Sequence, residues 1–307
     1  ILSLGMGTTV FAEDGDSHYP VTITTYNYEN EPVEMTFEKA PEKVFAYANS
    51  NIEELLALGL GDKIVAAYGL DGDVREDLKD EFDKIQYMDT KPSKEEVVAM
   101  EPDFIAAWYS SFSDDWLSDV SFWQERDVNT YMSLNSSAKG PASEFPRTIE
   151  DEYEDILNLG KIFDCEDKAE EIVDQMKGEI DKVKEHVEGT DPLSVAVLED
   201  EGDSFRVYGT ETLGGNIPET LGAELKLGAE NSENVGAEDL IAADPDVLFM
   251  INYDGFMTAD EAIADITDNP AYASLSAVKN NKVFSVNLNE VYCSGVRTYD
   301  GIMTFAK

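Results

Sequence analysis

The chain has 307 residues, 42% of them hydrophobic, which is enough apolar material for the cores of one large or two medium-sized domains. A disordered or fibrous protein is therefore disfavoured. Asp and Glu number 65 against 22 Lys and Arg, and the formal net charge of −43 repels nucleic-acid phosphates and anionic lipid head groups. We expect no nucleic-acid partner.

The first twelve residues (1–12, ILSLGMGTTVFA) are apolar or small and stand directly before the acidic run Glu13–Asp16. This pattern is typical of the tail of a secretory signal and its cleavage site, with a buried first strand as the alternative. No other apolar run approaches the roughly 20 residues needed to span a bilayer. We expect an exported protein in the periplasm or at the outer face of the cytoplasmic membrane, where a lipid anchor upstream would also fit.

Cysteine and histidine are scarce in this chain. Cys165 and Cys293 are the only cysteines, so the sequence indicates neither a disulfide framework nor a cysteine-based metal cluster. His18 and His186 have no carboxylate or second histidine at a spacing typical of a metal site. We expect two free thiols and no His-rich zinc or manganese site.

The segment that follows the acidic run has the alternating pattern of β-strands. Val21–Tyr28 alternates apolar and polar residues and Val33–Phe37 resumes the pattern after a turn, which predicts a β-hairpin. Val44–Tyr47 is a short apolar strand. Asn49, Ser50 and Asn51 follow it, and we expect them to cap a helix over Ile52–Leu58.

Strands and helices alternate after this helix. The sequence predicts a strand, a helix and a strand over Lys63–Tyr68, Glu95–Met100 and Phe104–Trp108. Such alternation indicates a mainly parallel, doubly wound sheet. We interpret four aromatic residues farther along as a cover over this half of the chain: Phe112, Trp116, Phe122 and Trp123.

Two helical patterns occupy the middle of the chain, over Thr148–Phe163 and Asp167–Val187. The second would be about 30 Å long, enough to cross between two domains. From Leu193 the alternation starts again. The strand candidates are Leu193–Leu198, Phe205–Tyr208, Val247–Ile251 and Val283–Val286, and the helix candidates are Asn216–Leu221, Ala237–Ala243 and Ala259–Ile266.

The fold class that follows is α/β, with two doubly wound αβ lobes joined by a single long α-helix and a ligand cleft between them. We expect an N-terminal lobe over residues 20–147, connecting helices over 148–188 and a C-terminal lobe over 189–307. The two halves also resemble each other, because Glu95–Phe104 matches Glu238–Val247 at a constant distance of 143 residues. Internal duplication explains this match, and chance similarity of common αβ turns is the alternative.

Several motifs resemble the periplasmic binding proteins for iron siderophores, heme and cobalamin, the helical-backbone class of ABC importer components. The resemblance runs from about Thr22 over nearly the whole chain. It is carried by Ala40–Ala46, Asn51–Val65, Pro102-Asp103, Pro245-Asp246 and Gly295–Gly301.

The resemblance implies a function as well as a fold. A protein of this class captures an iron siderophore or a related iron chelate, or alternatively heme or cobalamin, and delivers it to an ABC permease and its ATPase. It implies a monomer that closes only modestly. It also implies one exposed glutamate on each lobe for docking to the permease, here Glu95 and Glu238, although either could be only a helix-end charge.

Ligands of two-lobed αβ proteins meet the carboxyl ends of strands and the helix N-termini beyond them. Those loops are aromatic here, which suits a broad chelate. Tyr47 and Tyr68 could equally belong to the core, and Arg297 could only offset a neighbouring carboxylate. The candidate ligand-binding residues are Tyr47, Asn49, Ser50, Asn51, Tyr68, Trp108, Tyr109, Tyr208, Tyr253, Tyr292 and Arg297.

A metal chelate supplies its own donor atoms, so we expect no protein metal ligand. A binding protein also needs no catalytic residue and no cofactor, and we expect neither. The main rival is an αβ cleft enzyme such as a chelatase-like protein, since fold does not fix function. The sequence has no Gly-x-Ser-x-Gly elbow, Walker loop or His-Glu-x-x-His helix. A sensor or adhesin built on the same lobes is a third alternative.

Overall fold

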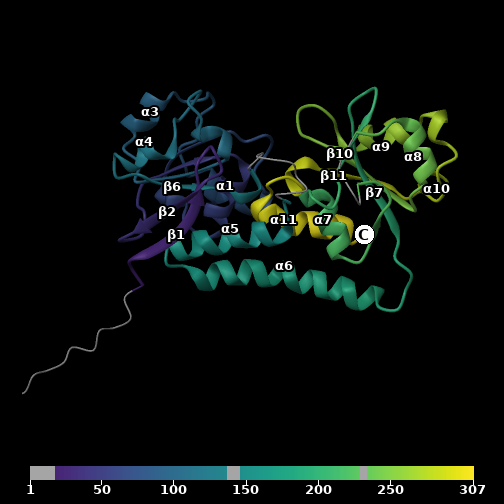
Figure 1. Ribbon diagram of the computed structural model, residues 1–307, viewed down its shortest axis with the longest axis horizontal. Coiled ribbons are helices and arrows are strands. Elements are labelled where there is room, and N and C mark those ends of the chain that lie inside the picture. The colour runs from purple at the N-terminus through teal and green to yellow at the C-terminus, as the bar shows by residue number, and fades with distance from the viewer. Residues whose placement is uncertain (1–17, 137–145, 229–233) are drawn as a thin grey trace, which may run out of the picture.

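The computed structural model describes residues 18–136, 146–228 and 234–307. The predicted leader remnant at residues 1–12 lies outside these ranges. Figure 1 shows two α/β halves side by side, with one long helix, α6, running beneath both. This arrangement agrees with the predicted two-lobed α/β fold.

A β-hairpin opens the described chain, as predicted. It consists of β1 (Val21–Tyr26) and β2 (Pro32–Phe37), paired antiparallel from Val21 opposite Phe37 to Tyr26 opposite Pro32. Ile23 and Met35 are buried, because the inward side of each strand packs on the first lobe.

The first lobe contains a four-stranded parallel sheet in the order β4-β3-β5-β6. Its strands are β3 (Val44–Tyr47), β4 (Ile64–Tyr68), β5 (Phe104–Ala107) and β6 (Asn129–Met132). Strand β6 was not predicted, because it has only four residues and begins with a polar one. The helices of this lobe are α1 (Asn49–Ala57), α2 (Lys79–Phe82), α3 (Lys94–Ala99) and α4 (Val120–Gln124).

The connecting helices are α5 (Ile149–Ile162) and α6 (Glu166–Val187). The helical conformation is interrupted between them at Asp164, whose φ of 55° lies in the left-handed region. Helix α6 has 22 residues and is therefore about 33 Å long. Ala169, Val173, Met176 and Ile180 form its buried stripe, as its apolar periodicity predicted.

The second lobe contains a sheet in the order β11-β10-β7-β8, with β9 beside β7. Its strands are β7 (Ser194–Asp200), β8 (Phe205–Val207), β9 (Glu224–Leu225), β10 (Val247–Asn252) and β11 (Val283–Asn287). All its pairings are parallel except that of β7 with β8. The helices are α7 (Leu213–Thr220), α8 (Ala237–Ala243), α9 (Ala259–Thr267), α10 (Ser276–Lys279) and α11 (Thr298–Phe305).

The two halves are built alike where their sequences match. Glu101 and Asp244, 143 residues apart, both have a left-handed φ, 51° and 41°. The aspartates two residues later both accept a backbone N–H where a neighbouring strand begins: Asp103 from Lys43 at 2.8 Å, and Asp246 from Ser194 at 3.0 Å. The parallel construction therefore extends from the sequence to the hydrogen bonds.

No helix in the described part of the chain is long and apolar enough to cross a membrane. The longest, α6, carries charged residues along most of its exposed side.

Candidate functional site

Aromatic side chains gather where the strands of the first sheet end. Tyr47 ends β3 and Tyr68 ends β4, and their rings are stacked with centroids 6.0 Å apart. Trp108 follows β5 and meets Tyr47 edge-on at 6.2 Å. Parallel strands bring these residues together because their carboxyl ends share one edge of the sheet.

Trp116 is buried in the first lobe, as the predicted cover implies, and it also belongs to the same cluster. Its ring meets Tyr47 at 4.7 Å and Tyr68 at 6.1 Å, and its indole N–H donates to the Pro92 carbonyl at 2.7 Å. Trp116 reaches the cluster through an irregular segment between β5 and α4, so no sequence period could place it there. We call Tyr47, Tyr68, Trp108 and Trp116 the aromatic cluster.

The second lobe faces this cluster with Tyr292, whose ring lies 6.0 Å from that of Trp108. Tyr109 lies beside Trp108 in sequence but stacks on Tyr28 of the hairpin at 5.6 Å, with the rings nearly parallel. Sequence reasoning did not predict Tyr28 at this position. Aromatic residues from three separate parts of the chain therefore line one region.

The loop after β10 also approaches the first lobe. Tyr253 follows β10 and packs on Phe256 at 5.4 Å. A Cβ atom placed on Gly72 would lie 2.1 Å from a carboxylate oxygen of Asp254, so the loops after β4 and β10 are in close contact. A bulky ligand between the lobes requires these loops to separate.

Helix α1 begins at the aromatic cluster, and its cap differs from the predicted one. We expected Asn49, Ser50 and Asn51 to cap the helix, but they form its first turn, and the N-cap is Ala48 with φ 74° and no side-chain hydrogen bond. The helix begins earlier because Ala48 takes the non-helical backbone conformation needed at the turn out of β3.

The polar side chains of this first turn have separate partners. Asn49 Oδ1 accepts the Asp71 N–H at 2.7 Å, and Ser50 Oγ accepts the Trp108 indole N–H at 3.0 Å. Asn51 Nδ2 donates to the Tyr47 carbonyl at 2.9 Å, so Asn51 fixes the strand–helix turn. Asn49 Nδ2 is buried and has no hydrogen-bond partner among the described residues.

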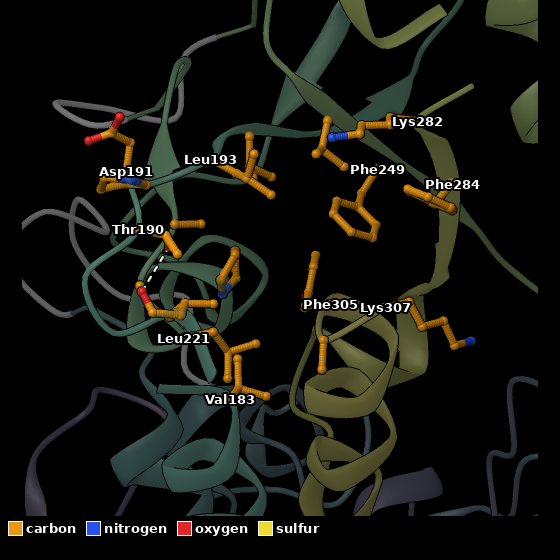
Figure 2. A pocket seen from close by; sticks show the side chains of 18 residues that line it. Val183, Thr190, Asp191, Leu193, Leu221, Phe249, Lys282, Phe284, Phe305 and Lys307 are labelled. Carbon is orange, nitrogen blue, oxygen red and sulfur yellow. Dashed lines mark hydrogen bonds between the residues drawn. The ribbon is translucent and has the colours of Figure 1, made fainter. Parts of the chain in front are cut away.

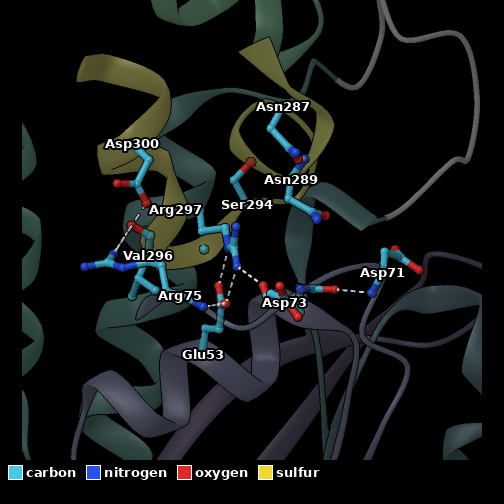
Figure 3. A network of polar contacts seen from close by, with 12 residues as sticks. Glu53, Asp71, Asp73, Arg75, Asn287, Asn289, Ser294, Val296, Arg297 and Asp300 are labelled. Carbon is cyan, nitrogen blue, oxygen red and sulfur yellow. Dashed lines mark hydrogen bonds and ion pairs between the residues drawn. The ribbon is translucent and has the colours of Figure 1, made fainter. Parts of the chain in front are cut away.

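Arg297 lies in an ion-pair network that joins the lobes (Figure 3). Its Nε and Nη2 each donate to a carboxylate oxygen of Glu53 at 2.7 Å, and Nη2 also donates to the Asp73 carbonyl at 2.6 Å. Glu53 is fully buried. Arg297 thus offsets a carboxylate, which was the alternative expectation, and its partner is Glu53, 244 residues away, rather than nearby Asp300.

Arg75 extends this network toward α11. It donates to the Val296 carbonyl at 3.0 Å and pairs with Asp77 at 2.7 Å and with Asp300 at 3.8 Å. Both arginines of the network therefore already have carboxylate partners in this conformation.

Three buried carboxylates lie behind α1. Glu54, Glu152 and Asp155 each place an oxygen within 4.8 Å of the others. Glu152 accepts the backbone N–H groups of Ser294 at 3.1 Å and Gly295 at 2.6 Å. Burial raises the pKa of Glu152 to about 7, and burial together with the neighbouring carboxylates holds the pKa values of Glu54 and Asp155 well above their usual range.

Tyr208 lies in the core of the second lobe instead of at the open carboxyl edge. It follows β8, which runs antiparallel to β7, so its backbone N–H meets Val197 near the middle of the sheet. The residue is 2% exposed and its hydroxyl donates to Glu199 at 2.9 Å. The expectation assumed a parallel strand, which would have carried Tyr208 to the cleft.

A separate apolar cavity of about 310 Å³ lies at the far end of the second lobe, between the C-terminal end of α6 and α11 (Figure 2). Its walls include Val183, Leu221, Phe249 and Phe305. None of the predicted ligand-binding residues lines it.

His18 lies against the turn between α5 and α6. Its Nδ1 is 3.4 Å from Asp164 Oδ1 and 3.3 Å from Glu166 Oε1, and its Nε2 is 2.7 Å from the Lys161 carbonyl. The sequence predicts no carboxylate ligand near His18. The fold supplies two from the turn between α5 and α6, which sequence spacing could not indicate. Cys165 and Cys293 are free thiols, as expected.

Glu95 and Glu238 occupy equivalent positions near the starts of α3 and α8, and both are exposed. Figure 1 shows α3 and α8 on different lobes, both on the side of the molecule away from α6.

Comparisons with known proteins agree with this architecture. The chain is 32% identical to a periplasmic binding protein from Veillonella parvula DSM 2008, whose crystal structure matches 93% of this chain and 90% of that one with a TM-score of 0.86. It is 24% identical to the uncharacterized ABC transporter substrate-binding lipoprotein YvrC of Bacillus subtilis (strain 168), over 94% of this chain and 85% of that protein. It is 25% identical to the Fe(3+)-citrate-binding protein YfmC of the same strain, over 64% of this chain and 58% of that protein.

A family model described as "Periplasmic binding protein" matches residues 44–287, which span both sheets and the helices between them. This match decides against the chelatase-like alternative, because the family consists of binding proteins. The chain therefore belongs to the periplasmic binding protein family.

Proposed function

We propose that this chain captures an iron siderophore or a related iron chelate outside the cytoplasm and delivers it to the permease and ATPase of an ABC importer. The observation that carries this proposal is the aromatic cluster, which contacts Tyr292 of the other lobe. Broad aromatic walls with a few polar groups suit a flat, bulky chelate. The relative named for Fe(3+)-citrate supports an iron chelate as the cargo.

In this proposal the ligand-contacting residues are Tyr47, Tyr68, Trp108 and Tyr292, with Trp116 added to the predicted set. Asn49 and Ser50 supply polar contacts, while Tyr109 and Tyr253 form the rim. Asn51, Tyr208 and Arg297 support the site from behind, since each has protein partners. Heme or cobalamin is the second candidate cargo, because the same aromatic walls suit either macrocycle.

We also propose that Glu95 and Glu238 dock the loaded protein onto the permease. Their matched exposure on two lobes supports this role, because a pair of carboxylates can meet two basic sites at once. Glu95→Lys with Glu238→Lys should abolish chelate import while leaving chelate affinity unchanged. Unimpaired import by the double variant contradicts the docking role.

We further infer an exported monomer with lobes over residues 20–147 and 189–307 and a connector over 148–188. Export and a lipid anchor are supported by the relative described as a lipoprotein. The connector is supported by α6, which is long enough to reach both lobes.

A ligand screen tests the proposed cargo. Purified protein is titrated with ferric citrate, a ferric hydroxamate, a ferric catecholate, heme, cobalamin and free ferric ion, and thermal unfolding and tryptophan quenching are recorded. A ligand at 100 times its Kd adds about 2.7 kcal/mol to the free energy of unfolding, which a thermal shift readily detects.

A saturable response to one ferric chelate class supports the proposal, and Trp108→Leu should weaken that response. A response to heme or cobalamin alone favours the second candidate. Silence toward the whole panel contradicts both.

A further inference from the structure

We propose that the N-terminus of α1 is a subsite for one anionic oxygen of the ligand, which points to a chelate that carries a carboxylate or hydroxycarboxylate group. This inference rests on the proposed function and names the ligand chemistry that the cleft selects. It follows from hydrogen-bond donors that the protein buries at the aromatic cluster without giving them acceptors.

The first turn of α1 offers three backbone N–H groups, those of Asn49, Ser50 and Asn51. The N–H of Ala48 donates to the Tyr68 carbonyl at 3.1 Å, and the N–H of Ile52 starts the helical bonding by donating to Ala48 at 3.1 Å. None of the three N–H groups between them has an acceptor within the described part of the chain. Such donors are ordinarily satisfied by a capping side chain, which Ala48 lacks.

These donors are also sheltered from bulk water. Asn49, Ser50 and Asn51 are 4%, 2% and 0% exposed. A buried N–H without an acceptor has a free-energy cost comparable to a lost hydrogen bond. A helix start of this kind is stabilised by an anion, which the helix dipole also favours.

The Asn49 side chain adds a fourth donor. Its Oδ1 accepts the Asp71 N–H at 2.7 Å, which fixes the other end of the amide as the donor Nδ2. Nδ2 is buried and has no partner among the described residues. Because Asn49 is the first residue of α1, this amide belongs to the same turn as the three backbone donors.

The donors adjoin the aromatic cluster directly. Ser50 Oγ accepts a hydrogen bond from the Trp108 indole N–H at 3.0 Å, and Tyr47 lies two residues before the first residue of the helix. A chelate lying against these rings would therefore bring a peripheral oxygen to the start of α1 once the loops after β4 and β10 separate.

The charges nearby limit what can bind. Arg297 is engaged by Glu53, so the subsite binds its anion through uncharged donors. The carboxylate of Asp71, in the facing loop, opposes a second negative charge at this position. The geometry thus favours a single anionic oxygen.

Substitution of Asn49 tests the subsite. Asn49→Asp keeps the acceptor for Asp71 but places a negative charge where the ligand oxygen would lie, and Asn49→Ala removes Nδ2 without adding charge. Asn289→Asp is the matched control, since it makes the same chemical change on the facing lobe. Kd values for ferric citrate and for a ferric hydroxamate complex are measured by tryptophan quenching, with thermal unfolding to verify folding.

Asn49→Asp should weaken ferric citrate binding by about tenfold or more, and Asn49→Ala should weaken it less, as expected for loss of a hydrogen bond to a charged group. Hydroxamate binding should change less than about threefold in both variants, as should binding of either complex by Asn289→Asp.

The outcomes separate this inference from the proposed function. Equal losses for both complexes, no loss in either Asn49 variant, or wild-type binding of the hydroxamate alone overturns the subsite while leaving iron-chelate capture in place. If the wild-type protein binds no ferric chelate of any class, the proposed function fails and the subsite fails with it.

Discussion

Three acidic side chains, Glu54, Glu152 and Asp155, share one buried site between α1 and α5. Two of them have compensating donors: Asp155 accepts the Tyr131 hydroxyl at 2.7 Å, and Glu152 accepts Asn135 Nδ2 at 2.7 Å. The carboxyl group of Glu54 accepts no hydrogen bond from the described part of the chain. Burial and like charge therefore favour the protonated forms in the folded state.

This cluster makes stability depend on pH. The folded pKa of each acid is raised above its ordinary value, 4.5 for the two glutamates and 3.8 for Asp155, so between the two values the native state binds more protons than the unfolded state. The free energy of unfolding should therefore fall as pH rises from about 4.5 through 7. For Glu152 alone, the pKa rise from 4.5 to about 7 corresponds to roughly 3 kcal/mol.

Glu54→Gln should reduce this fall in the free energy of unfolding, because a neutral side chain of the same shape replaces one buried acid. We expect the variant to be more stable than wild type at pH 8 and nearly equal to it at pH 4.5, as measured by urea unfolding. Glu95→Gln, which alters an exposed acid on α3, serves as the control and should change neither value. A wild-type protein whose stability does not fall from pH 5 to pH 8 contradicts the argument.

Individual site residues could be predicted only in part. Tyr47, Tyr68 and Trp108 follow short apolar strands, and parallel pairing brings such strand ends together. The partner of Arg297 could not be predicted, since Glu53 lies 244 residues away and resembles any helix-surface glutamate in sequence. Trp116 is buried in the first lobe, as predicted, but its contacts with Tyr47 and Tyr68 could not be predicted, because its segment has no regular structure to fix its direction.

The strands and helices around the aromatic cluster are joined by tight turns. The backbone geometry of these turns determines where the aromatic side chains lie. Gly69 directly follows β4 with φ +90°, and a Cβ atom there would lie 2.4 Å from the Tyr47 ring. Glycine is therefore required both for the turn and for the close approach of the ring.

Gly69→Ala should destabilise the protein and displace Tyr47 from the cluster. Gly59→Ala is the matched control, because Gly59 has a similar φ of +80° but nothing within 4 Å of its added Cβ. Both variants carry the backbone strain of about 1 kcal/mol, and only Gly69→Ala should also weaken chelate binding. Equal binding by the two variants would show that the Tyr47 contact has no effect on the site.

Secondary structure was predictable where hydrophobic periodicity was strong. Helices α5 and α6 and strands β3, β4 and β10 lie within a few residues of their predicted ranges. The direction of β8 was not predictable, because a three-residue strand carries no signal for antiparallel pairing. The cap of α1 was also wrong, since Asn and Ser favour an N-cap locally while the turn out of β3 places the cap at Ala48.

At the scale of the whole molecule, residues 292–300 return to the first lobe and to α5. Tyr292 meets Trp108, Gly295 donates to Glu152, and Arg297 pairs with Glu53. The two sheets are therefore joined by these contacts as well as by α6. Most of these contacts are buried, so losing them would expose unpaired charges and donors in the first lobe.

We accordingly expect both lobes to unfold in one transition. All three tryptophans, Trp108, Trp116 and Trp123, lie in the first lobe, so their fluorescence reports that lobe while far-UV circular dichroism reports the whole chain. The two urea curves should have the same midpoint. Arg297→Ala, which leaves Glu53 buried without its partner, should shift both midpoints downward together. Separate midpoints in the wild-type protein contradict a single cooperative unit.

The return of residues 292–300 to the first lobe also has a consequence for biogenesis. During synthesis, the first lobe leaves the ribosome long before Gly295 and Arg297 are made. Glu53 and Glu152 therefore lack these two partners until translation is nearly complete. Without these contacts two buried carboxylates lack these donors, so we expect the partial chain to be less stable until residues 292–300 are made. The order of residues along the chain thus postpones the full stability of the first lobe until nearly all of the sequence has been made.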